Sequence, residues 1–168
     1  MNQHPINILV FDSGVGGLSI AQEIHKRLPH CTISYASDNA AYPYGTKTEK
    51  VLIDRVDTVL HKLIDHTQAD IAVVACNSAS TLALPTIRQR IQQPVVGVVP
   101  AIKPAVHISH TGVIGVLATP GTAKRRYTHE LVNEFAPDQS VILHGCSQLV
   151  AMAEALLRGH PPLSLIHI

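Results

Sequence analysis

The chain has 168 residues, of which 46% are hydrophobic, and its mean hydropathy is +0.19. Thirteen basic and 12 acidic side chains, scattered along the chain, leave a formal net charge of +1. This composition excludes a largely disordered polypeptide and lacks the basic stripe of nucleic-acid binders, so we expect no nucleic-acid partner. The length suffices for one hydrophobic core, or for one domain and part of another.

Cysteine usage and apolar runs bear on the cellular compartment. The three cysteines, Cys31, Cys76 and Cys146, are odd in number and widely spaced, which argues against a disulfide framework and a structural zinc site. No apolar run approaches the ~18 residues that span a bilayer, and residues 1–5 do not resemble a signal peptide. We therefore expect a cytoplasmic protein without a membrane anchor.

Strands and helices alternate from the start of the chain. Residues 7–11 are predicted as a strand, followed by a glycine-rich turn at residues 12–17 and a helix that ends at Pro29. Residues 32–36 are predicted as a second strand. A capping-box pattern at residues 46–49 then opens a long amphipathic helix.

Cys76 follows a short apolar run, residues 72–75, that is typical of a buried parallel strand. Asn77, Ser78 and Ser80 are residue types favoured at helix N-caps, so a helix should begin just after the strand. Cys76 would then lie at the carboxyl end of a strand, where open α/β sheets bind ligands. The helix dipole favours its thiolate, but free cysteines are also often simply buried, and both interpretations stay open.

A further strand at 95–99 and a short helix at 102–108 are predicted next. From residue 112 the chain repeats the order of its first half, with a strand at 112–118, a turn at 119–122 before a helix, a strand at 141–143 and a helix at 148–157. This alternation indicates an α/β fold with a doubly wound parallel sheet. If both halves share one period, the equivalent of the Cys76 strand is expected to end at about residue 182, beyond the last residue.

The turn after the first strand has the composition of an anion cradle before a helix. Gly14 and Gly16, with Asp38 about twenty residues on, give a dinucleotide site partial support. The third glycine position is not glycine, however, and Asp12 would repel a pyrophosphate. A smaller ligand with a carboxylate and an ammonium group suits Asp12 and Ser13 better. A helix N-cap role for Asp12 is compatible with this.

Cys76 is a candidate nucleophile or proton carrier. A phosphatase-like loop is excluded because Leu82 stands where an arginine is required, and no histidine is identified as a papain-like partner. A thiolate that removes a weakly acidic α-proton stays open; it needs a dry site and fixed donors for the developing charge. Metal binding is not expected, because the eleven histidines are mostly isolated and His107 and His110 lack the Glu of a zincin motif.

Five segments together resemble glutamate racemases, with the likeness running from Ile6 to about Gly159. They are residues 10–19, 42–45, 73–81, 94–104 and 117–122. The resemblance implies a cofactor-independent enzyme that interconverts L- and D-glutamate for peptidoglycan synthesis. It also implies two pseudosymmetric flavodoxin-like domains, the second incomplete here. One cysteine from each domain flanks the α-carbon of the substrate; one removes the proton and the other supplies a new one from the opposite face.

The resemblance also implies roles for individual residues. Cys76 matches the first of the two cysteines, Asp12 the carboxylate that assists it, and Glu154 an acidic residue that assists on the second side. The residues that match substrate contacts are Ser13, Tyr44, Gly45, Asn77, Ser78, Thr119 and Thr122. Glu154 is equally well explained as an exposed helix residue, which is the usual position of Glu.

The chain departs from the family at the second cysteine, whose Gly-Cys-Thr-His motif it lacks. Cys146 follows the second strand of its half, so it corresponds to residues 36–37 and is expected to be structural. We expect a first domain at residues 1–98, an incomplete second domain at 99–159 and a non-family tail at 160–168. We also expect no racemase activity from this polypeptide alone.

Two other functions stay open. A module that binds an amino acid or a protein without chemistry is the main alternative, and a dinucleotide-dependent oxidoreductase is the third. A homodimer and DNA gyrase, which some racemases of this family are reported to restrain, are candidate partners without independent support from the residues.

Overall fold

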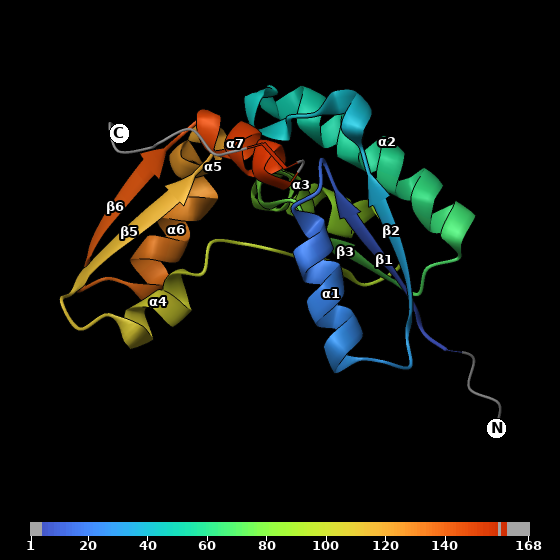
Figure 1. The fold of residues 1–168 in the computed structure, drawn as a ribbon, viewed down its shortest axis with the longest axis horizontal. Coiled ribbons are helices and arrows are strands. Elements are labelled where there is room, and N and C mark those ends of the chain that lie inside the picture. Colours follow the sequence, from blue (N-terminus) through green and yellow to red (C-terminus); the bar gives the residue numbers. More distant parts are fainter. Residues whose placement is uncertain (1–4, 158, 161–168) are drawn as a thin grey trace. The chain divides into compact units, whose positions relative to one another are not determined.

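The computed structural model describes residues 5–157 and 159–160, which divide into two compact units, the first ending at Pro100 and the second beginning at Ala101 (Figure 1). The elements of the first unit are β1 (Asn7–Asp12), α1 (Gly17–Arg27), β2 (Thr32–Ser37), the short 3₁₀ helices η1 (Asn39–Ala41) and η2 (Tyr44–Thr46), α2 (Glu49–Thr67), β3 (Ile71–Val74), α3 (Asn77–Arg90) and β4 (Val95–Gly97). Those of the second are α4 (Ile102–Ile108), β5 (Val113–Ala118), α5 (Pro120–Lys124), α6 (Arg126–Phe135), β6 (Ser140–Gly145) and α7 (Gln148–Leu157).

The first unit is built on a parallel sheet with the strand order β2-β1-β3-β4. This order is that of flavodoxin-like sheets, and it confirms the predicted α/β class. Phe11 pairs with Val74, and Asp12 pairs with Ser37. The central strands therefore end side by side, and the turns that follow them share one edge of the sheet.

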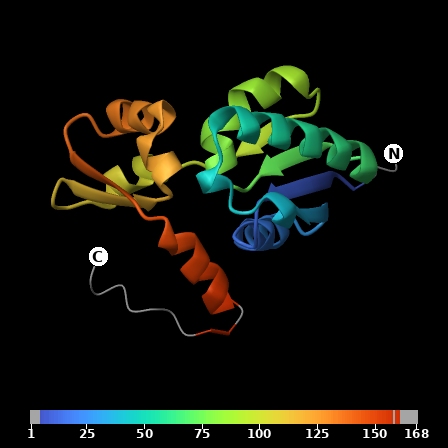
Figure 2. The ribbon, with the colours of Figure 1, turned by 90° about the horizontal axis from the view of Figure 1, so that it is seen from above.

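Alternation along β1 sends its side chains to two separate cores. Leu9 and Phe11 are completely buried in a cluster with the apolar side chains of α2 and α3, whereas Ile8 and Val10 pack with those of α1. Helix α1 covers one face of the sheet, and α2 and α3 cover the other (Figure 2). Because β1 is buried on both faces, its central residues 8–11 are all apolar and not alternating.

The second unit has a parallel pair, β5 and β6, in which Val113 lies opposite Ser140. Its chain path matches that of β1 and β2. The N–H of Cys146 donates to the carbonyl of Ala118 at 2.8 Å, just as the N–H of Asp38 donates to that of Asp12 at 2.9 Å. Cys146, which is buried, thus stands at the position of Asp38, one residue beyond the predicted equivalence.

Some predicted boundaries were wrong. The last strand of the first unit ends at Gly97, earlier than the predicted 95–99. The expected capping box does not form, because Thr48 is the N-cap of α2 without a side-chain hydrogen bond, and Thr46 donates instead to the carbonyl of Pro43. The domain limits at 1–98 and 99–159 stay predictions.

The predicted non-family tail at residues 160–168 lies outside the described residues except for His160. In the part of the chain that the structure describes, no helix combines the length and the apolar composition needed to cross a membrane.

Gly17, the first residue of α1, is required by close packing. A Cβ atom there would lie 2.8 Å from Cβ of Asp12 and 3.0 Å from Cβ of Ala75. We expect Gly17→Ala to lower the free energy of unfolding by about 1–3 kcal/mol, measured by urea denaturation. Gly16→Ala is the matched control, because its nearest contact is Asp12 Oδ2 at 3.7 Å; we expect a loss below about 1 kcal/mol. Equal losses in the two variants would contradict the packing argument.

Candidate functional site

Cys76 lies between β3 and α3, at the carboxyl end of the strand and at the N-cap of the helix. The N–H of Ala75 donates to the carbonyl of Phe11 at 2.7 Å, which draws the residues after β3 against those after β1. As a result, Cys76 Sγ lies 3.5 Å from Ser13 Oγ, within hydrogen-bonding distance for sulfur. The thiol is at the sheet edge predicted from the sequence, beside the turn that begins at Asp12.

The net shift in the pKa of the Cys76 thiol is upward, although the helix N-terminus favours the thiolate. Cys76 is only 6% exposed, and burial raises the pKa of its thiol; the nearby negative charge of Asp12 raises that pKa further. Ser13 and the backbone N–H groups of Ala79 and Ser78 lower the pKa, but by less. The helix N-terminus therefore acts as predicted, and the loss of water around the sulfur outweighs it.

The turn after β1 is tightly organised around the carboxylate of Asp12, which is 6% exposed. Its Oδ2 accepts hydrogen bonds from the N–H of Gly14 at 3.3 Å and of Gly17 at 3.0 Å. The hydroxyls of Tyr35 and Ser37, both on β2, donate to the carbonyl of Gly14 at 2.9 and 2.6 Å. Asp12 is not itself the N-cap of α1, but its carboxylate binds the N-terminus of that helix, so capping and a site role coexist.

The beginning of α3 supplies the other predicted contacts of the first unit. Asn77 is exposed and Ser78 is buried. Ser80 stabilises this end of the helix, because its hydroxyl donates to the carbonyl of Val74 at 2.8 Å and accepts from the N–H of Val98 at 3.1 Å. The first turn of α3 is therefore anchored to β3 and to the segment after β4.

Tyr44 is completely buried, and its hydroxyl donates to Asp38 Oδ2 at 2.6 Å. Burial and this carboxylate raise the pKa of Tyr44 well above its usual value, so the hydroxyl stays protonated. The side chain of Tyr44 is engaged within the protein, and its carbonyl accepts from the N–H of Lys47 at 3.1 Å; Gly45 is half-buried.

Sequence reasoning did not find that Asp38 and Arg55 form an ion pair. Arg55 donates to both carboxylate oxygens, through Nε at 2.7 Å and through its terminal nitrogen at 2.6 Å. The guanidinium holds the pKa of Asp38 below its usual value. Both oxygens are thus occupied, which removes the ribose-binding carboxylate that a dinucleotide site requires. The signal for this pair was weak, since 17 residues separate its members.

The remaining predicted residues belong to the second unit. Thr119 is the N-cap of α5; its Oγ1 accepts from the N–H of Thr122 at 3.3 Å and donates to the hydroxyl of Thr122 at 3.1 Å. Thr122 is 1% exposed. Glu154 lies half-buried on α7. Thr119 follows β5 as Ser13 follows β1, so the two units present hydroxyls at equivalent positions.

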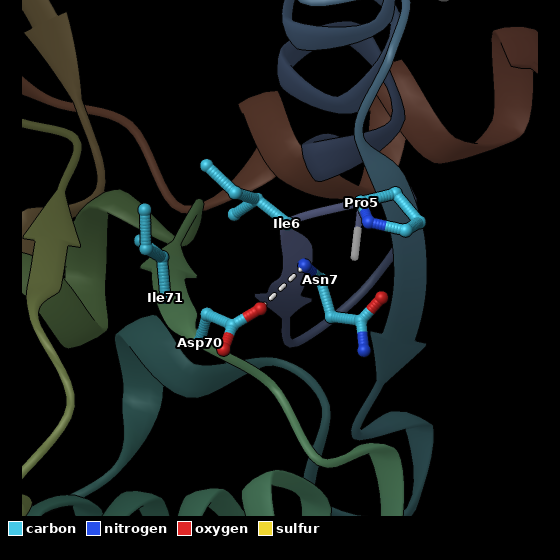
Figure 3. A pocket seen from close by; sticks show the side chains of 5 residues that line it. All are labelled: Pro5, Ile6, Asn7, Asp70 and Ile71. Carbon is cyan, nitrogen blue, oxygen red and sulfur yellow. Dashed lines mark hydrogen bonds between the residues drawn. The ribbon is translucent and has the colours of Figure 1, made fainter. Parts of the chain in front are cut away.

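A hollow on the opposite edge of the first sheet does not belong to this site. Its volume is about 550 Å³, and its lining residues are Pro5, Ile6, Asn7, Asp70 and Ile71 (Figure 3). The N–H of Asn7 donates to Asp70 there at 2.8 Å. The hollow lies at the amino ends of β1 and β3, whereas sheets of this type bind ligands at the carboxyl ends. Among residues 5–157 and 159–160, no three His, Cys, Asp or Glu side chains gather as metal ligands would.

The two neighbours of Cys76 should shift its ionisation in opposite directions. We expect Asp12→Asn to lower the pKa of the Cys76 thiol, because a negative charge is removed, and Ser13→Ala to raise it, because a donor to the thiolate is lost; each shift should be up to about one unit. The measurement is the pH dependence of Cys76 alkylation by iodoacetamide, followed by peptide mass spectrometry. Shifts of the same sign in both variants would contradict this electrostatic description.

Comparisons with known proteins identify the family of the chain. A family model for Asp/Glu/Hydantoin racemases matches residues 18–165. Glutamate racemases of Vibrio campbellii and Vibrio cholerae are 55% and 52% identical to the chain, covering 90% and 92% of it and 56% and 58% of their own lengths. The chain therefore spans little more than half the length of these relatives.

Solved structures give the same result. Escherichia coli glutamate racemase, in complex with L-glutamate and the activator UDP-MurNAc-Ala, matches with a TM-score of 0.90 and 46% identity, over 95% of this chain and 60% of that one. Glutamate racemase from Aquifex pyrophilus matches with a TM-score of 0.79 and 35% identity, over 90% and 60%. On the family model, the sequence relatives and the shared fold, the chain is a member of the Asp/Glu/Hydantoin racemase family.

Proposed function

We propose that this chain carries one half of a glutamate racemase site, in which the Cys76 thiolate exchanges the α-proton on one face of glutamate. The observation that carries the proposal is the location of Cys76: beside Ser13 and the Asp12 turn, at the carboxyl edge of a flavodoxin-like sheet. A 46%-identical relative of the same fold is described in complex with L-glutamate. The buried thiol is suited to this reaction, because a desolvated thiolate is a stronger base than a hydrated one.

The residues around the thiol divide the work in this proposal. Asp12 assists the proton transfer at Cys76, and its negative charge keeps the thiol protonated until substrate binds. Ser13, Asn77 and Ser78 hold the polar groups of glutamate, with the N-terminus of α3 favouring its carboxylate. The backbone of Tyr44 and Gly45 contributes further donors. All of these groups belong to the first unit, and water must be excluded around them for a weakly acidic α-proton to be removed.

The opposite face of the α-carbon needs a second acid. In the proposal, Thr119 and Thr122 contact substrate from the second unit, and Glu154 assists there. Cys146 is not a candidate for the second acid, because it stands where Asp38 stands in the first unit. The racemase that contains this half site would act in the cytoplasm and supply D-glutamate for peptidoglycan. The homodimer and the gyrase interaction stay predictions.

We expect the 168-residue chain alone not to convert L-glutamate to D-glutamate, because one face of the α-carbon lacks a cysteine. The measurement is the circular dichroism of an L-glutamate solution over time at high protein concentration, with a racemase of full family length as the positive control. Turnover by the chain alone would overturn the assignment of the missing acid.

Glutamate should shield Cys76 if the site is correctly identified. We expect L- or D-glutamate to slow alkylation of Cys76 by iodoacetamide about tenfold at saturation, while alkylation of Cys146 in the other unit stays unchanged. NAD serves as the control ligand and should give no protection. Equal alkylation rates of Cys76 with and without either enantiomer would contradict the proposed substrate. Protection by NAD instead would restore the dinucleotide interpretation.

A further inference from the structure

Asp38, Tyr44 and Arg55 form a compact polar cluster next to the site, and we name it the Arg55 cluster. The side chain of Asp38 is 4% exposed, and it accepts two hydrogen bonds from Arg55 and one from Tyr44, all between 2.6 and 2.7 Å. Charge-assisted, two-pronged pairs of this kind are the strongest hydrogen bonds that side chains make. The cluster joins α2, which carries Arg55, to the segment between β2 and α2.

Tyr44 connects this cluster to Cys76. Its ring packs at a tilt on Phe11, with ring centroids 6.3 Å apart, and both rings lie in the same buried apolar cluster as Cys76 and Ala79. The short helix η2, which begins at Tyr44, packs against α3. The negative charge of a Cys76 thiolate is near enough to raise the pKa of the Tyr44 hydroxyl. Tyr44 is therefore part of the packing in which the thiol is buried.

Apolar side chains do not fill the space between α2 and the segment that joins β2 to α2. A cavity of about 140 Å³ lies between the segment and α2, lined by residues that include Ala40, Tyr44, Leu52 and Arg55. Side chains that face a void lose dispersion contacts on that side. The segment is also made of two short 3₁₀ helices, which have few internal hydrogen bonds. The polar cluster thus ties the segment to α2 beside a place where apolar packing leaves a void.

We propose that Arg55 is a positioning residue for the reaction: acting through Asp38, it holds Tyr44 and Gly45 against the end of α3 that carries Cys76. The relevance of this to glutamate rests on the proposed function, but the effect on the thiol does not. Without Arg55, the Asp38 carboxylate loses its counter-charge in a buried position, and it reorients toward water. Tyr44 then loses a fixed hydrogen-bond acceptor, and the segment opens above the thiol.

The test measures the limiting alkylation rate of Cys76 at high pH, where the thiolate is fully formed, so that access and not ionisation is compared. The charged or titratable groups that face this thiol are Asp12 on β1 and Tyr44 on η2. We expect Arg55→Met to raise the limiting rate about tenfold, because segment opening becomes more frequent. Arg55→Lys, which keeps the charge, should restore most of the protection.

Arg90→Met is the matched control. Arg90, the last residue of α3, pairs at 2.7 Å with Asp57, which lies on α2 as Arg55 does. Arg90 is also about half exposed, but it lies away from η2. Removing it should leave the rate of Cys76 unchanged. Cys31, which is half-buried elsewhere in the same unit, reports general loosening and should react at its wild-type rate in all variants.

Each outcome decides the proposal. A wild-type rate at Cys76 in Arg55→Met would overturn it, and so would an equal rise at Cys31 and Cys76, since that would show loss of stability throughout the unit. If Arg55→Met does not fold, Tyr44→Phe replaces it: this variant keeps the ion pair and removes only the link to η2, and it should also accelerate alkylation of Cys76. A wild-type rate in Tyr44→Phe would then overturn the proposal. No glutamate is present in these assays, so a failure of glutamate to protect Cys76 would count against the proposed function alone.

Discussion

The site depends on the parallel pairing of β1 with β3. The hydrogen bond from Ala75 to Phe11 ends that pairing. Ser13, the first residue after β1, and Cys76, the second residue after β3, are thereby brought to 3.5 Å although 63 positions separate them. Gly17 allows α1 to approach this junction closely, and the carboxylate of Asp12 binds the N-terminus of that helix. Because strand register determines these contacts, a slip of one residue would separate the thiol from its partners.

The chemistry follows from opposing effects on one sulfur atom. Burial and the charge of Asp12 raise the pKa of Cys76, while Ser13 and the first N–H groups of α3 stabilise its thiolate. A base that removes a proton from carbon benefits from both effects. Desolvation makes the thiolate more basic, and fixed donors stabilise it so that it can form. These groups come from two parts of the first unit, the end of β1 and the start of α3, and in our proposal the Arg55 cluster holds η2 beside them.

The sequence was sufficient for what depends on local pattern. Buried strands, amphipathic helices and the turn residues between them identify the α/β class. An apolar run that leads into Cys76 and then into N-cap residues places the site at the carboxyl edge of the sheet. Properties that depend on opposing effects or on tertiary packing could not be predicted from local pattern. The sign of the Cys76 pKa shift depends on how completely packing excludes water, and the Asp38–Arg55 pair joins side chains that no periodicity relates. The hydrogen bond from the Tyr44 hydroxyl to Asp38 could not be predicted either, because tertiary packing determines it.

The most direct test of Cys76 as a base at carbon is the exchange of the glutamate α-hydrogen with deuterium from D₂O, followed by NMR for each enantiomer. A single thiol can return a proton only to the face of the α-carbon from which it removed one. The account predicts deuterium in one enantiomer with its configuration kept, lost in Cys76→Ala and retained in Cys146→Ala. Exchange of neither enantiomer, or exchange that survives in Cys76→Ala, would contradict it.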